Sequence, residues 1–175
     1  MNRPRTTSHA NLALRALEPE DLEVLYAWEN VCEWWFEGST VQPWTRETLK
    51  RYIAQIQDIY TDRQLRLMVT LDDQPLGLFD LYAYEPRHAR AGIGILVGND
   101  SLRGQGWGHR ALKAGIKYAT EQLMIRILYA HVADTNNASK ALFKAGGFSH
   151  TATFPAWLAH PDGPIDVHHY QLNLP

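Results

Sequence analysis

Apolar residues in the 175-residue chain recur at two spacings, every second residue in some segments and every third or fourth in others. The first spacing predicts strands with one buried face, and the second predicts helices with one apolar face. Along the chain we expect a strand over 12–17, a helix from Pro19, a helix from Thr45 to Tyr60, strands over 65–71, 76–84 and 91–97, a helix after 108, a strand over 127–132, a helix over 138–145 and two closing strands. This order of elements predicts one α/β domain, with a mixed sheet and helices packed on it.

Composition narrows the class of protein. Residues 1–10 are polar and lack an apolar signal core, so we expect a disordered or frayed tail followed by one domain over 11–175. No segment approaches 18 apolar residues, which argues against a membrane span, and a net charge of −2 argues against a nucleic-acid partner. Cys32 is the only cysteine, so an internal disulfide is excluded and a cytoplasmic location is expected.

A glycine-rich segment, Arg103-Gly104-Gln105-Gly106-Trp107-Gly108, stands between the strand predicted over 91–97 and the next helix. Glycine lets the backbone approach a ligand closely, and the first N–H groups of a helix point at a bound anion. The arginine adds a cation that can bind phosphate through two hydrogen bonds. This arrangement predicts a phosphate site, although its spacing fits neither a mononucleotide P-loop nor a dinucleotide-binding fingerprint.

The same run matches Arg/Gln-x-x-Gly-x-Gly/Ala, and a second segment strengthens the match. Between Asp134 and Phe148, Asn136 ends a strand, a short helix follows, and Gly147-Phe148 opens the next strand. The two segments and their spacing resemble the GNAT family of N-acetyltransferases, within it the branch of ribosomal-protein N-terminal and spermidine N-acetyltransferases. The resemblance covers roughly residues 12–173. It implies a mixed, mostly antiparallel sheet flanked by helices, with acetyl-CoA as co-substrate.

The resemblance also implies how acetyl-CoA is held. The backbone of Leu96 and Val97 is expected to pair with the pantetheine arm, as an added strand would. Asn136 is expected to hydrogen-bond the pantetheine or its surroundings, and Phe143 to lie beside the cofactor. The pyrophosphate is expected to bind to the backbone amides of the glycine-rich segment, which are those of Arg103, Gly104, Gln105, Gly106, Trp107 and Gly108.

Two positions depart from the family pattern. Many relatives carry a glutamate base at the position of Gly92, and an amine of pKa near 10.4 costs about 4.6 kcal/mol to deprotonate at pH 7. We consider Asp80, on the preceding strand, and Glu37 or Glu33 as substitutes, although Asp80 could equally be solvated or paired with an arginine. Phe143 stands where many relatives carry a tyrosine acid. Its loss is tolerable, because a thiol of pKa near 8.5 needs only about 2 kcal/mol to leave as thiolate.

An acidic and aromatic segment suggests where the acceptor binds. Residues 18–37 hold seven acids and no lysine or arginine, together with three tryptophans. Acidic and aromatic side chains interleaved can line a site for an organic cation, and we assign substrate binding to Glu33, Trp34 and Trp35. The alternative is a solvated acidic helix face followed by aromatic residues of the core.

The sequence therefore predicts an N-acetyltransferase that acts on a primary amine, either of a small, polyamine-like cation or of a peptide N-terminus. The alternatives are a catalytically weak acyl-CoA-binding regulatory module of the same fold, or a fold kept for protein interaction. No metal is expected, because His168 and His169 are neighbours on a strand and face opposite sides of it. The closing strand pair would also allow a homodimer.

Overall fold

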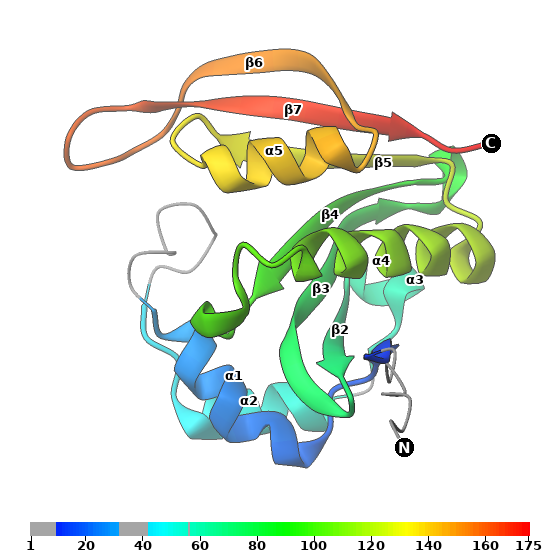
Figure 1. Ribbon diagram of the computed structural model, residues 1–175, viewed down its shortest axis with the longest axis vertical. Coiled ribbons are helices and arrows are strands. Elements are labelled where there is room, and N and C mark those ends of the chain that lie inside the picture. The colour runs from blue at the N-terminus through cyan, green and yellow to red at the C-terminus, as the bar shows by residue number, and fades with distance from the viewer. Residues whose placement is uncertain (1–9, 32–41, 56) are drawn as a thin grey trace, which may run out of the picture.

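The computed structural model describes residues 10–31, 42–55 and 57–175, and Figure 1 shows the arrangement of their elements. The elements are β1 (Leu12–Arg15), η1 (Pro19–Asp21), α1 (Leu22–Glu29), α2 (Arg46–Ala54), α3 (Ile59–Asp62), β2 (Leu65–Leu71), β3 (Gln74–Glu85), η3 (Pro86–His88), β4 (Arg90–Val97), η4 (Asp100–Leu102), α4 (Trp107–Leu123), β5 (Ile127–Ala133), α5 (Asn137–Ala145), β6 (Ser149–Leu158) and β7 (Ile165–Asn173). None of the helices in these ranges is long and apolar enough to cross a membrane.

The strands form one seven-stranded sheet in the order β1-β2-β3-β4-β5-β7-β6. Every neighbouring pair is antiparallel except β4 and β5, which are parallel. The mixed, mostly antiparallel sheet expected from the sequence is thereby confirmed.

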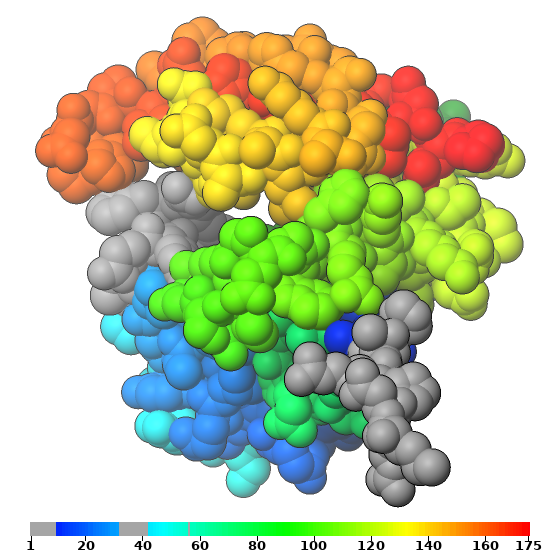
Figure 2. All heavy atoms as spheres, viewed as in Figure 1, coloured from blue at the N-terminus to red at the C-terminus, as the bar shows by residue number. Residues whose placement is uncertain are grey.

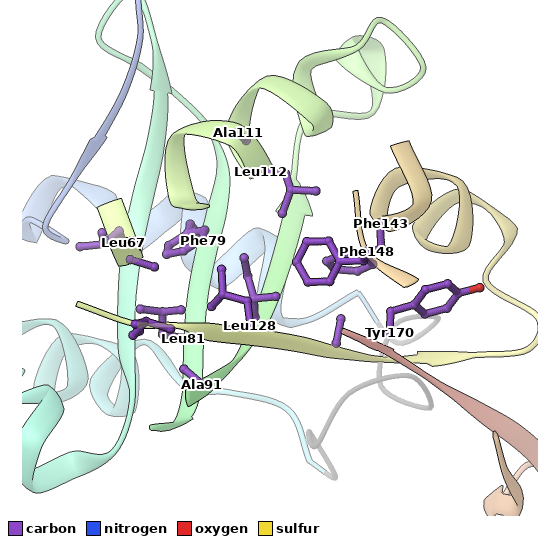
Figure 3. Close-up of a cluster of buried hydrophobic side chains, with 14 of the residues drawn as sticks. Leu67, Phe79, Leu81, Ala91, Ala111, Leu112, Leu128, Phe143, Phe148 and Tyr170 are labelled. Atoms are coloured by element: carbon purple, nitrogen blue, oxygen red, sulfur yellow. The ribbon is translucent and has the colours of Figure 1, made fainter. Parts of the chain in front are cut away.

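Alternation along the strands builds a core on each face of the sheet. On one face Phe79 and Leu81 of β3 join Ala111 and Leu112 of α4 in the larger cluster, which Figure 3 shows together with Phe143 of α5. On the other face Leu78 and its neighbours pack against α1 and α2, in a cluster formed by Leu17, Leu25, Trp28, Leu49, Met68 and Leu78. We call the second face the α1–α2 face; it also carries Asp80 and Tyr82, because successive strand side chains alternate.

The helix predicted from Thr45 to Tyr60 is wrong in its extent. Thr45 caps it as expected, since its hydroxyl accepts from the Thr48 N–H, but α2 ends at Ala54. Gln57 instead pairs with the backbone of Arg66, accepting from its N–H at 2.7 Å, which ties this segment to the start of β2. Asp58 then caps the separate helix α3. Two caps and a side-chain-to-backbone pair outweigh the continuous apolar spacing.

The first strand is also shorter than expected. It ends at Arg15, whose guanidinium binds both carboxylate oxygens of the buried Asp21 at 2.7 and 2.8 Å. Asp21 in turn accepts from the backbone N–H of Glu18 in a capping box at the start of η1. The chain therefore turns after Arg15, and Leu17 packs beneath α1 instead of extending the strand.

The parallel pair β4–β5 determines where a ligand could enter. Its register joins Arg90 to Ile127, Ala91 to Leu128 and Gly92 to Tyr129, and then stops. Both strands continue, β4 to Val97 and β5 to Ala133, and in Figure 1 they diverge from the right of the view toward the left. We call the space between them the β4–β5 opening.

A substitution at Gly115 of α4 tests how closely this helix packs against the sheet. A Cβ at this position would lie 1.9 Å from the ring of Phe79. We expect Gly115→Ala to lower the free energy of unfolding by about 1–3 kcal/mol, although helix propensity alone would raise it by about 1 kcal/mol. Urea unfolding measures the change. Lys113→Ala, at an exposed position of the same helix, serves as the control and should stay within about 0.5 kcal/mol. A stabilised Gly115→Ala protein would contradict the close packing.

Candidate functional site

The edge of β4 that faces the opening is the first part of the site. Residues 93–97 pair with β3 on one side, but the register with β5 ends at Gly92. Backbone N–H and C=O groups seek partners, so a strand edge of this kind accepts an extended ligand as an additional strand would. Leu96 and Val97, the predicted pantetheine contacts, lie on this edge, with Leu96 packed on the α1–α2 side and Val97 on the other.

The glycine-rich segment is next to this edge, on the surface seen in Figure 2. Gly104 and Gly106 have φ of +74° and +85°, and a Cβ at either would meet no atom of the described residues within 4 Å. Gly106 is the N-cap of α4 and has no side chain that could cap it, so the first N–H groups of a 17-residue helix are left for a ligand. An anion fits this open cradle, as the sequence predicts for the pyrophosphate.

Arg103 ties the glycine-rich segment to the preceding strand and turn. Its Nε donates to the Val97 carbonyl at 2.9 Å, and its guanidinium pairs with Asp100 at 2.9 Å. These contacts fix the glycine-rich segment to the end of β4, so the anion cradle and the free strand edge form one continuous surface.

Two other predicted cofactor residues lie on α5. The Asn136 carboxamide oxygen accepts from the Ser139 N–H at 2.9 Å and caps the helix. Phe143 is only 4% exposed, and its ring lies 5.1 Å from that of Phe148 in the core. The structure thus gives both residues a structural role, and their contacts with the cofactor stay predictions.

Asp80 belongs to an ion cluster on the α1–α2 face. The Arg66 guanidinium binds both of its carboxylate oxygens, at 2.7 and 3.0 Å, and also pairs with Glu29 at the end of α1. Burial by itself would lower the pKa of Arg66, but the charge of Asp80, its hydrogen bonds and the charge of Glu29 outweigh burial and raise that pKa. Asp80 is therefore paired with an arginine, and proton transfer to it would disturb that pair.

Arginines from elsewhere in the chain pair with three acids of the acidic segment. Asp21 pairs with Arg15, Glu23 with Arg46, and Glu29 with Arg66. The residues predicted to bind substrate, Glu33, Trp34 and Trp35, and the predicted base Glu37 lie outside the described residues, so these assignments stay predictions.

The sequence interpretation missed an aromatic and histidine group on the α1–α2 face of β3, β5 and β7. Nε2 of His131 lies 3.0 Å from Nδ1 of His169. The Tyr129 ring stacks on the His169 ring, with 5.3 Å between the ring centroids. Burial and the charge of the partner lower the pKa of His131, and burial likewise lowers the pKa of His169. These rings border a cavity of about 600 Å³. Alternation along each strand predicts which face of the sheet a ring lies on. The order of strands β5-β7-β6 is what brings the rings of different strands together.

Tyr82 was also missed. It lies opposite Gly92 in the β3–β4 register, and a Cβ on Gly92 would lie 2.1 Å from the Tyr82 ring. The position where many relatives carry a glutamate is therefore filled by a tyrosine from the neighbouring strand. The alternation of 78–82 puts Tyr82 on the same face as Asp80, but only the strand register reveals its contact with Gly92.

A metal site is not formed by the described part of the chain, where the His, Cys, Asp and Glu side chains do not gather into a group of three that could hold an ion. The features that could hold a ligand are an anion cradle, a free strand edge, and the polar side chains of Asp80 and Tyr82. These two side chains lie near the end of the β4–β5 pairing at Gly92 and Tyr129, which we call the apex of the β4–β5 opening.

Comparison with known proteins decides the family. The model of the acetyltransferase (GNAT) domain matches residues 11–149. The chain belongs to the GNAT acetyltransferase family. This acetyltransferase uses acetyl-CoA as co-substrate, which the anion cradle and the free edge of β4 can accommodate. A search of curated proteins found no match.

Solved structures share the fold of this acetyltransferase at low identity. The spermidine N-acetyltransferase of Vibrio cholerae in complex with CoA and spermine has a TM-score of 0.80 at 22% identity, over 93% of this chain and 95% of that chain. A dodecameric structure of spermidine N-acetyltransferase from the same organism has a TM-score of 0.75 at 22% identity, covering 93% of each chain. A probable acetyltransferase gives 0.75 at 21% identity, over 93% of this chain and 92% of that chain.

A substitution at Gly106 tests whether the anion cradle binds CoA. We expect Gly106→Ala to weaken CoA binding at least about tenfold, because alanine at positive φ costs about 1–2 kcal/mol and its methyl group enters the cradle. Isothermal titration with CoA measures the change. Gly163→Ala is the matched control, since Gly163 also has positive φ (+117°) and open space around it but lies between β6 and β7. Equal CoA affinity of the Gly106→Ala and wild-type proteins would contradict the assignment.

Proposed function

We propose that this acetyltransferase transfers the acetyl group directly to a primary amine that arrives from the α1–α2 face. The observation that carries the proposal is Gly94, which lies on β4 two residues beyond the last β4–β5 pair. Among the described residues, only Asp80 would lie within 4 Å of a Cβ at this position, at 3.6 Å. An open position beside a carboxylate, at the edge of the opening, leaves room for an ammonium group.

The cofactor residues then form a line along the free edge of β4. The pyrophosphate is assigned to 103–108, and the pantetheine to the backbone of Leu96 and Val97. An extended arm that pairs with β4 and continues away from the cradle passes from Val97 toward Gly92. Its reactive end therefore reaches the apex of the opening, next to Gly94 and Asp80.

Asp80 is the proposed group that meets the amine. Arg66 pairs with both Asp80 and Glu29, so Asp80 shares its guanidinium partner with a second carboxylate. An ammonium beside Asp80 would be attracted by its carboxylate. Because Arg66 holds both oxygens of Asp80, we propose that Asp80 orients the ammonium and that its proton leaves to water. Glu37 remains the second proposed catalytic residue.

Two acceptor classes are supported by different observations. Similarity of fold to spermidine N-acetyltransferases and the acids at Glu33 and Glu37 support a polyamine-like cation. The arginine pairs of Asp21, Glu23 and Glu29 leave less free negative charge than the sequence implies, which supports an acceptor with a single ammonium, such as a peptide N-terminus.

Location and assembly are also proposals. A cytoplasmic location rests on the single cysteine. A homodimer is supported by β6, which is the last strand in the sheet and carries Trp157 with 64% of its surface exposed.

Thiol release from acetyl-CoA tests the proposed function, with spermidine, spermine, simple diamines and peptides with free N-termini as acceptors. We expect turnover with polyamines, peptides or both. In Asp80→Asn the kcat/KM for the amine should fall about tenfold or more, because a charge-assisted contact contributes about 1.5–3 kcal/mol. CoA affinity should be unchanged in this variant.

Asp73→Asn, in the β2–β3 turn, is the matched control and should keep the wild-type kcat/KM. Saturable CoA binding without turnover on any amine would contradict the proposal and favour the acyl-CoA-binding regulatory module. Loss of CoA affinity in Asp80→Asn would place Asp80 in cofactor binding instead.

A further inference from the structure

The side chain of Tyr82 crosses β4 at Gly92. Tyr82 is on β3, and its ring atoms lie 2.1–2.6 Å from the place where a Cβ of Gly92 would stand. The ring thus occupies the side-chain space of Gly92 on the α1–α2 face. Any side chain at position 92 would displace the ring, so glycine here is what allows a residue of β3 to reach toward β5.

The far end of Tyr82 reaches β5. The ring meets Tyr129 of β5 edge to face with centroids 5.9 Å apart, which directs the Tyr82 hydroxyl toward the backbone of His131. Tyr129 is the last β5 residue in register with β4, and His131 lies two residues beyond it. The hydroxyl therefore lies at the apex of the β4–β5 opening, where the reactive end of the cofactor is proposed to arrive.

Protonation decides what this hydroxyl can do. Burial raises the pKa of Tyr82 to about 12, against the hydrogen bond from His131, which lowers it. The phenol is consequently protonated near neutral pH and cannot serve as a base. Because the phenol keeps its proton, the hydroxyl can donate a hydrogen bond to an acceptor in the opening.

We propose that the Tyr82 hydroxyl is a catalytic residue that donates a hydrogen bond to the thioester carbonyl oxygen and stabilises the negative charge that develops there. The role rests on the proposed acetyl transfer to an amine. In that step the amine nitrogen forms a bond to the carbonyl carbon, the C–S bond breaks, the thiolate leaves, and the amine proton passes to water. Tyr82 keeps its proton throughout. A hydrogen-bond donor that the protein holds in place stabilises the developing charge more than a water molecule does, because the donor need not reorient during the reaction.

The proposal accounts for both departures from the family pattern. Gly92 lacks the glutamate of many relatives because the Tyr82 ring takes its place. Phe143 has no hydroxyl and is buried in the core, where it packs on Phe148. A tyrosine hydroxyl is therefore present near the reactive end of the cofactor, but it comes from β3 instead of α5.

Tyr82→Phe removes the hydroxyl and keeps the ring. At saturating acetyl-CoA and amine we expect kcat to fall by at least about a hundredfold, as for other removed donors of this kind, with CoA affinity and the KM for the amine near their wild-type values. Tyr118→Phe, the same substitution in α4, should keep the wild-type kcat. A kcat of Tyr82→Phe within about twofold of wild type would overturn the proposal, even if the variant is less stable.

A second readout does not depend on the acceptor. In isotope-edited infrared spectra of bound [1-¹³C]acetyl-CoA, the carbonyl stretch should lie at lower frequency with the wild-type protein than with Tyr82→Phe. Equal frequencies would overturn the proposed hydrogen bond. If the wild-type protein acetylates no amine, the proposed function fails, while this comparison still decides the role of Tyr82. If Tyr82→Phe does not fold, 3-fluorotyrosine at position 82 should lower the carbonyl frequency, and an unchanged frequency would contradict the donor.

Discussion

The short parallel pairing of β4 with β5 is the constraint on which the rest of this structure depends. Three residue pairs hold the two strands together, after which their edges separate and their backbone groups need other partners. On β4 the free edge over 93–97 leads directly to the glycine-rich segment, which Arg103 ties to Val97. The opening, the strand edge and the anion cradle are therefore consequences of one feature of the sheet, and together they suit an extended ligand with a phosphate group at one end.

Groups on the α1–α2 face then give this opening its chemistry. Gly94 leaves space beside Asp80, and Gly92 lets Tyr82 cross from β3 to the backbone of His131. Arg66 holds the carboxylates of both Asp80 and Glu29. In this account the departure from the family pattern at Gly92 follows from the packing of Tyr82, whose ring requires a glycine opposite it.

Much of the fold could be predicted from the sequence, because strand and helix periodicities are local and the two family segments lie at the ends of strands. The helix over 45–60 was wrong because the pairing of Gln57 with Arg66 depends on a strand that begins later in the chain. The glycine-rich segment could be found from one short run of sequence, and Gly104 and Gly106 have positive φ in the structure; its binding of a phosphate stays a prediction. The proximity of Tyr82, His131 and His169 was missed because it arises from register and sheet order, which alternation within a single strand does not contain. The arginine partners of the acidic segment could not be predicted either, because they lie elsewhere in the chain and meet the acids only in the folded structure.

The central claim is that acetyl-CoA lies along the free edge of β4, with its pyrophosphate on the glycine-rich segment. Hydrogen–deuterium exchange with and without CoA tests it most directly. The account predicts slower exchange of the amides of 93–97 that face β5 and of the amides of 103–108, with no change in β1 and β2. Unchanged exchange in both segments, with protection instead around the cavity beside Tyr129 and His169, would contradict it.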